Sequence, residues 1–101
     1  MSYTVIISPE ANEDLTDILG WYSTQSTKEV KKRLIEDFSK TFKTLEKSPK
    51  SFSIRFKNTR CAVMKKYPYN IYYWVDDSDS TANIFAILHQ KRNPAVWQDR
   101  V

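Results

Sequence analysis

The chain has 101 residues, of which 41% are hydrophobic and 14% aromatic, and it carries a formal net charge of +4. This length supports one domain, residues 1–101, and the composition excludes a disordered or fibrous protein. Cys61 is the only cysteine, which excludes an internal disulfide and a multi-cysteine metal site. No apolar stretch is long enough for a signal peptide or a membrane span, so we expect a cytoplasmic protein.

The charge is unevenly distributed along the chain. Residues 1–46 hold 6 Lys/Arg and 8 Asp/Glu, whereas residues 47–101 hold 10 Lys/Arg and 4 Asp/Glu. A basic half-domain indicates an anionic partner such as nucleic acid or an acidic protein. A basic surface that is merely solvated explains the same counts equally well.

The first predicted elements are a strand and a helix. Alternation at Tyr3, Val5 and Ile7 predicts a strand that ends at Ser8. Ser8 can cap the following helix, and Pro9 suits its first position. An apolar stripe then recurs at helical spacing through about residue 23, at Ala11, Leu15, Ile18, Leu19 and Tyr22.

A second helix is predicted to begin at Ser26, because Ser26 and Glu29 have the spacing of a capping box. Pro49 follows its end. Its buried side is marked by Val30, Leu34, Phe38, Phe42 and Leu45. Few residues separate the two helices, so we expect an antiparallel hairpin.

Beyond Pro49 the apolar period changes from helical to two. We expect either a short strand or an irregular segment at Ile54 and Phe56. A strand over residues 60–66, a turn at 67–70, a strand over 71–75 and a polar turn at 76–80 then lead into the last strand. Apolar residues on both faces of the last strand predict a central place in the sheet: Ala82, Ile84, Ala86 and Leu88 on one face, and Phe85 and Ile87 on the other. Asn93 and Pro94 begin a short terminal helix that carries Trp97 and Arg100.

The predicted fold class is α+β, with an N-terminal strand, an antiparallel helical hairpin, an antiparallel three-stranded meander and a short C-terminal helix. Successive strands joined by short turns are antiparallel. The pattern leaves open whether the first strand pairs at the sheet edge or between meander strands.

The order of these elements and several motifs resemble the RelE/ParE toxin superfamily of bacterial toxin–antitoxin systems. The resemblance spans almost the whole chain, and its tail most resembles the ParE-like branch. The segments that carry it are Tyr3-x-Val5-x-Ile7-Ser8-Pro9-Glu10-Ala11-x-x-Asp14-Leu15-x-x-Ile18, Pro49, Tyr69-x-Ile71-Tyr72-Tyr73-x-Val75, and Ile87-Leu88-His89-x-x-Arg92-Asn93-Pro94-x-x-Trp97.

The resemblance implies a small toxin held silent by a cognate antitoxin, whose flexible segment folds on it. In the ParE branch the implied activity is inhibition of DNA gyrase by protein binding. In the RelE branch it is ribosome-dependent cleavage of messenger RNA. No cofactor is implied, and the sequence has no metal or nucleotide motif, since Gly20 is the only glycine and His or Cys residues do not cluster.

RNA cleavage through the ribose 2′-hydroxyl requires a general base, cations beside the phosphate and an acid for the leaving oxygen. In a ribonuclease the candidates for these roles are His89, Arg92, Lys65 and Arg60. The candidates for binding the target or the antitoxin are Lys66, Tyr73, Lys91, Arg92 and Trp97. RelE-like toxins usually carry a proton-transferring residue in the tail, and Trp97 stands where the tyrosine of a RelE-like tail would be. Because an indole does not exchange a proton, this position argues against RNA cleavage, and we favour gyrase inhibition.

Both polar candidates at the end of the last strand also have structural interpretations. We interpret His89 first as a residue that hydrogen-bonds the tail or the backbone there. Arg92 either anchors the terminal helix to a carboxylate such as Asp99 or holds an acidic antitoxin residue. A decayed toxin that retains only antitoxin binding is a third possibility.

The aromatic residues are interpreted mainly as packing groups. Trp97 is expected to pack the terminal helix onto the sheet, and Trp21 and Trp74 to belong to the core or its rim. Four tyrosines could stack on bases but are more often sheet packing: Tyr67, Tyr69, Tyr72 and Tyr73. The apolar surface predicts a groove beside the helical hairpin or the sheet edge, suited to an amphipathic helix or an added strand of the antitoxin.

Overall fold

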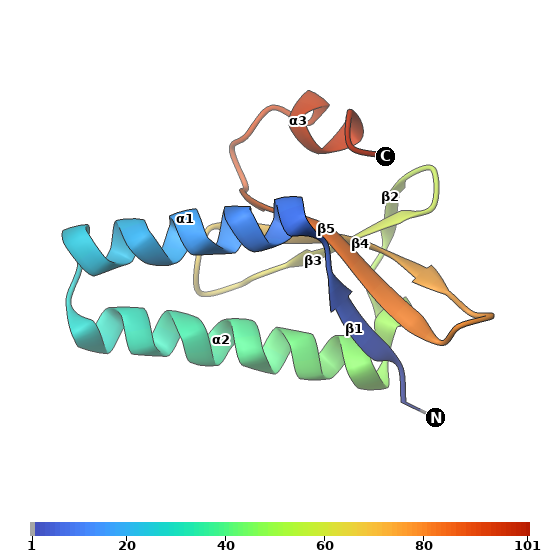
Figure 1. Ribbon diagram of the computed structural model, residues 1–101, viewed down its shortest axis with the longest axis horizontal. Helices are drawn as coiled ribbons and strands as arrows, with labels where there is room; N and C mark the ends of the chain where they lie inside the picture. Colours follow the sequence, from blue (N-terminus) through green and yellow to red (C-terminus); the bar gives the residue numbers. More distant parts are fainter. Residues whose placement is uncertain (1) are drawn as a thin grey trace.

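The computed structural model describes residues 2–101 and confirms the α+β class. Helices α1 (Pro9–Gln25) and α2 (Lys28–Lys47) form an antiparallel hairpin on one side of a sheet, and the short helix α3 (Ala95–Gln98) lies on the other (Figure 1). A 3₁₀ turn, η1 (Pro49–Ser51), follows α2. The strands are β1 (Thr4–Ile7), β2 (Ile54–Phe56), β3 (Thr59–Val63), β4 (Tyr69–Asp76) and β5 (Thr81–His89). Of residues 2–101, no helical stretch combines the length and apolarity that a membrane span needs.

The five strands form one sheet in the order β1-β5-β4-β3-β2. β1 runs parallel to β5, and the other neighbouring pairs are antiparallel. The central position predicted for the last strand is confirmed, because β5 lies between β1 and β4. β1 takes the edge, and the long stretch of chain between it and β5 supplies the connection that a parallel pair requires.

Side-chain caps fix the starts of both long helices. Ser8 caps α1 as predicted, but the cap of α2 is Thr27, whose hydroxyl accepts a first-turn N–H at 3.2 Å. The prediction of Ser26 was wrong by one residue, because the Ser26 N–H already ends α1 by donating to the Tyr22 carbonyl. Glu29 therefore falls one position short of the capping-box site.

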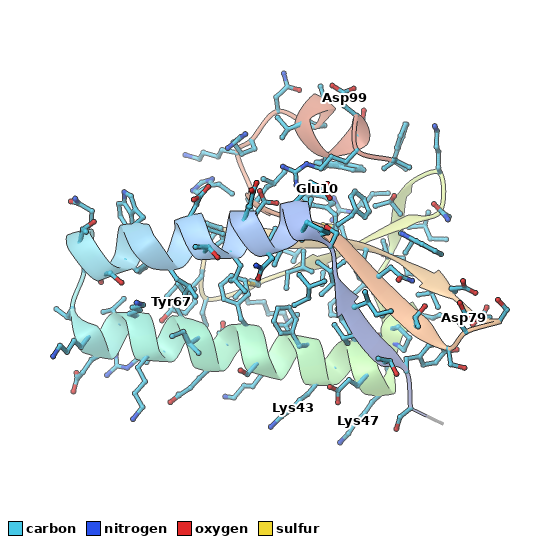
Figure 2. The ribbon with its side chains drawn as sticks, viewed as in Figure 1. Glu10, Lys43, Lys47, Tyr67, Asp79 and Asp99 are labelled. Carbon is cyan, nitrogen blue, oxygen red and sulfur yellow. The ribbon has the colours of Figure 1, made fainter. Side chains whose placement is uncertain are left out.

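The main core lies between the helical hairpin and the sheet. The apolar stripes predicted for both helices face it, whereas Lys43 and Lys47 point away from the sheet on the outer side of α2 (Figure 2). Burial of this apolar surface is the main source of stability of the fold. Its larger members are Tyr22, Leu34, Phe38, Leu45, Met64, Tyr69, Ile71, Tyr73, Ile84 and Ile87.

β5 contains a β-bulge at Phe85. Between consecutive pairs the register advances by two residues on β5, from Ile84 to Ala86, but by only one on β4, from Tyr73 to Tyr72. Ala82 and Ile84 consequently pack on the helix side, whereas Ala86 and Leu88 pack on the α3 side. The prediction that these four residues share one face was wrong, because one inserted residue reverses the alternation beyond it.

The connection between β3 and β4 also differs from the prediction. β3 ends at Val63 rather than at residue 66, and β4 begins at Tyr69, inside the segment predicted as a turn. The Tyr69 N–H donates to the Tyr67 carbonyl at 2.9 Å, which makes a tight turn around Pro68. Lys65 and Lys66 therefore lie in a turn and not on a strand.

The α3 side of the sheet carries a smaller second core. The Trp97 ring stacks on Tyr72 with centroids 4.4 Å apart and meets Phe56 edge-on at 5.8 Å, so the predicted packing role of Trp97 is confirmed. Trp21 and Trp74 lie outside both cores, because 57% of Trp21 and 36% of Trp74 is exposed. Each lines a surface cleft instead.

Candidate functional site

One corner of the molecule is basic. It combines the turn before β4 with the segment that follows β5. We call its five residues the basic corner: Lys65, Lys66, His89, Lys91 and Arg92. Gln90 joins the two segments, since its N–H donates to the Pro68 carbonyl at 2.8 Å and its side-chain amide to the Met64 carbonyl at 3.1 Å. The four cations are exposed, and none forms an ion pair within the part of the chain that the structure describes.

Local hydrogen bonds hold His89 at the end of β5. Its Nδ1 accepts the Lys91 N–H at 3.1 Å, and its carbonyl accepts the Arg92 N–H at 2.9 Å. Its ring meets Tyr69 edge-on at 5.7 Å. These contacts agree with the structural interpretation of His89. Because Nδ1 accepts a backbone proton, Nε2 is the ring nitrogen left to face a partner.

A cleft of ≈ 400 Å³ opens beside the basic corner, between α1 and the end of β5. It lies beside the helical hairpin, where the sequence predicts a groove. Burial, with a further contribution from Tyr22, raises the pKa of Tyr69 in its wall, so this phenol stays protonated at neutral pH. The apolar lining is Ile18, Trp21, Tyr22, Pro68, Tyr69, Ile87 and Leu88, and the polar lining is Asp14, Asp17, His89 and Arg92.

An ion pair that the sequence analysis missed fastens the tail to α1. Arg100 binds Asp14 through two hydrogen bonds, Nη1 to Oδ2 at 2.7 Å and Nη2 to Oδ1 at 3.2 Å. The same two side chains occupy the β5 edge beyond the end of β1: Arg100 donates to the Phe85 carbonyl at 3.2 Å, and Asp14 accepts the Ile87 N–H at 3.0 Å. We call this arrangement the tail latch. Arg100 thus performs the anchoring that was one of two alternatives for Arg92, and Arg92 stays exposed.

The candidate ribonuclease residues do not form one cluster. Arg60 lies opposite Tyr73 on β4, whereas His89 lies opposite Tyr69. At about 3.4 Å per residue, the two positions are separated by more than about 10 Å along the strand direction. The Arg60 guanidinium donates to two carbonyls in and just after η1, at 3.1 and 2.7 Å, and so holds that turn against the sheet. Lys65 and Arg92 are at the basic corner with His89.

Two residues predicted to bind the target or the antitoxin are buried. Tyr73 is 0% exposed, its hydroxyl donates to the Pro49 carbonyl, and burial raises its pKa to about 12. Trp97 is 5% exposed and lies against Tyr72. Both residues therefore have a packing role in this structure, and their binding role stays a prediction. Lys66, Lys91 and Arg92 are exposed and remain candidates.

The remaining reactive side chains are packing groups. Burial raises the pKa of the Cys61 thiol and of the Tyr72 hydroxyl, which lie together beneath α3. The predicted packing role of the strand tyrosines is confirmed for Tyr69, Tyr72 and Tyr73, which are buried. In residues 2–101, no group of three or more His, Cys, Asp or Glu is placed to hold a metal ion.

Several solved structures share this fold. The ParDE system from P. aeruginosa matches with a TM-score of 0.72 and 16% identity, covering 86% of this chain and 95% of that one. RelBE2 from Mycobacterium tuberculosis matches with a TM-score of 0.60 and 20% identity, covering 88% and 99%. E. coli RelBE matches with a TM-score of 0.58 and 16% identity, covering 89% and 99%. At these identities the likeness is one of fold.

The family assignment comes from the sequence. No curated protein matches the chain closely enough to count as a relative. Residues 5–94, however, match the family described as "ParE toxin of type II toxin-antitoxin system, parDE". That match extends from β1 through the basic corner and ends just before α3. The chain therefore belongs to the ParE toxin family of type II toxin–antitoxin systems.

Proposed function

We propose that this protein stops growth in the cytoplasm by binding DNA gyrase, and that a cognate antitoxin silences it. The observation that carries the proposal is the burial of Trp97 against Tyr72. A ribonuclease of RelE type would use a proton-transferring side chain at this tail position, and an indole cannot serve. The neighbouring Tyr72 does not replace that group, because it is buried beneath the Trp97 ring and presents little surface to a substrate.

The cations support binding rather than bond cleavage. Arg60 is held at η1, away from His89. Three other cations are exposed: Lys66, Lys91 and Arg92. Exposed cations of this kind suit docking on an acidic protein surface. Such a surface acts by charge complementarity and needs no general base.

We place the antitoxin in the cleft between α1 and the end of β5. Its apolar lining suits the hydrophobic side chains of a segment that folds when it binds. Because Arg92 and His89 line the same cleft, a bound segment would cover part of the basic corner. Occupation would also stabilise the toxin by mass action. Related folds have been solved as toxin–antitoxin complexes, which supports a protein partner.

Induction of the protein from a tight promoter tests the proposed target. Plasmid supercoiling and DNA breaks are compared with messenger RNA integrity and translation within minutes of induction. We expect altered supercoiling or DNA breaks with intact messages, and we expect His89→Ala to retain this effect. Codon-positioned message cleavage that disappears in His89→Ala or Arg92→Ala would establish a ribonuclease instead. Normal growth despite accumulation of folded protein would show a decayed toxin.

A further inference from the structure

The charge of α1 is opposite to that of the whole protein. The net charge of the chain is +4, yet residues 9–25 contain four carboxylates and no Lys, Arg or His. The four carboxylates are Glu10, Glu13, Asp14 and Asp17. Arg100 balances one of them, Asp14, in the tail latch. Figure 2 shows Glu10 at the start of α1, on the side of α3.

Asp17 is the carboxylate that both lines the cleft and lacks a cation. Asp14 and Asp17 are the two carboxylates in the cleft wall. Asp14 is occupied by Arg100, whereas Asp17 forms no ion pair with any residue in 2–101. The acidic side chain is exposed, so it is available to a partner that enters the cleft.

An exposed aromatic ring accompanies Asp17. Trp21 follows four residues later, which places it on the same side of α1, and it lines the same cleft. Its ring meets Tyr22 edge-on at 5.1 Å and keeps 57% of its surface exposed. A carboxylate one helical turn from an exposed indole offers a guanidinium both an ion pair and a stacking surface.

We infer that the α1 wall of the cleft, formed by Asp17 and Trp21, is a subsite for an arginine side chain of the antitoxin segment. The inference rests on the proposed antitoxin binding and adds the chemistry of the residue that docks there. Arginine suits the site better than lysine, because the planar guanidinium stacks on an indole while it hydrogen-bonds a carboxylate.

The opposite wall of the cleft gives the bound segment a direction. Arg92 and His89 line that side, so a cation and a carboxylate, Arg92 and Asp17, face the same space from different elements. A segment that carries arginine toward Asp17 and an acidic residue toward Arg92 matches both walls. The reverse order brings like charges together, which disfavours it.

The test uses the purified full chain and short acetylated, amidated peptides as probes. Each peptide contains two leucines and an acidic residue, with arginine in one and its neutral isostere citrulline in the other. Binding is followed by the indole N–H signal of Trp21 in NMR spectra, which is identified by its loss in Trp21→Phe. We expect the arginine peptide to bind about five- to tenfold more tightly than the citrulline peptide, from one exposed ion pair and one cation–π contact. A lysine peptide should fall between them.

Two variants locate the effect. Asp17→Asn should lower the preference for arginine over citrulline to the part that stacking on Trp21 contributes, whereas Glu13→Gln, which makes the same charge change outside the cleft lining, should keep most of it. Thermal unfolding confirms that both variants are folded. Equal binding of the two peptides, no shift of the Trp21 signal at millimolar peptide, or an unchanged preference in Asp17→Asn would each overturn the inference.

The outcome is separable from the target of the toxin. An arginine preference without any effect on gyrase would leave the subsite standing and defeat the proposed target. Gyrase inhibition without an arginine preference would support the proposed target and defeat the subsite.

Discussion

Replacing Asp14 by alanine should release the tail latch. The side chains of Asp14 and Arg100 are 13% and 26% exposed, so water competes only partly for their hydrogen bonds. The substitution deletes two hydrogen bonds to the guanidinium and leaves the Ile87 N–H without its acceptor. A hydrogen bond to a charged group contributes about 1.5–3 kcal/mol, and an unsatisfied N–H costs about 1–3 kcal/mol. Because the site is partly solvated, we expect a total loss of about 2–3 kcal/mol.

Urea unfolding followed by circular dichroism measures this loss. In a two-state domain of this size, about 2 kcal/mol lowers the melting temperature by roughly 10 °C. Arg100→Ala and the double variant complete a mutant cycle, in which we expect a coupling free energy of about 1 kcal/mol or more. Asp17→Ala is the matched control, because it makes the same change on the same helix at an exposed carboxylate that forms no ion pair in residues 2–101, and it should change the stability by less than about 0.5 kcal/mol. An unchanged midpoint in Asp14→Ala, or strictly additive single effects, would refute the account of the latch.

Three further predictions concern the packing residues and the histidine. Trp97→Ala should lower the free energy of unfolding by about 3 kcal/mol through loss of the Tyr72 and Phe56 contacts, and Trp97→Phe by clearly less; equal losses in denaturant unfolding would contradict this. His89→Gln removes the hydrogen bond from Lys91 and should cost about 1 kcal/mol while growth inhibition on induction persists; loss of inhibition in a folded variant would point to chemistry at His89. Burial raises the pKa of Tyr73 to about 12, above its ordinary value of 10.0. The unfolded chain therefore loses this proton first, so the contribution to stability is complete below about pH 10 and falls as the pH rises to about 12. Tyr73→Phe should make that alkaline fall in melting temperature smaller, while Tyr69 and Tyr72, whose pKa values burial also raises, keep the rest of it. An identical fall in both proteins would refute the assignment.

The helices could be predicted well because their signals are local. The cap at Ser8, the terminating Pro49 and the stripes of 3.6-residue period each lie within, or directly beside, the helix that they mark. The wrong prediction for the cap of α2 shows the limit of these local signals. Ser26 and Thr27 both suit an N-cap, and only the end of α1 decides between them.

The strand register could be predicted less well than the helices from the pattern of apolar residues. A period of two identifies strands but assumes uninterrupted alternation, and the bulge at Phe85 breaks it without any change of composition. The edge position of β1 could not be predicted from the sequence either, because it depends on the pairing of β1 with β5, which is far away in the chain.

The basic corner was predictable in part because His89, Lys91 and Arg92 are neighbours in the chain, directly after a strongly apolar strand. The tail latch joins positions 14 and 100 and has no such local signature. One signal was present: Asp14 comes three residues after Ala11 and four before Ile18, so helical spacing alone places this carboxylate on the side of the apolar stripe. A carboxylate there requires a partner.

The parallel pairing of β1 with β5 also determines when the fold can form during synthesis. Thr4 lies opposite Thr81, and β5 is the strand that joins β1 to the rest of the sheet. β1 therefore has no strand to pair with until β5 has been synthesised, and the helices between them have no complete sheet to cover until then. A nascent chain that stops before Thr81 leaves β1 and β4 with unpaired edges and the main core open. The domain thus becomes a folded molecule only after the whole of β5 has been synthesised.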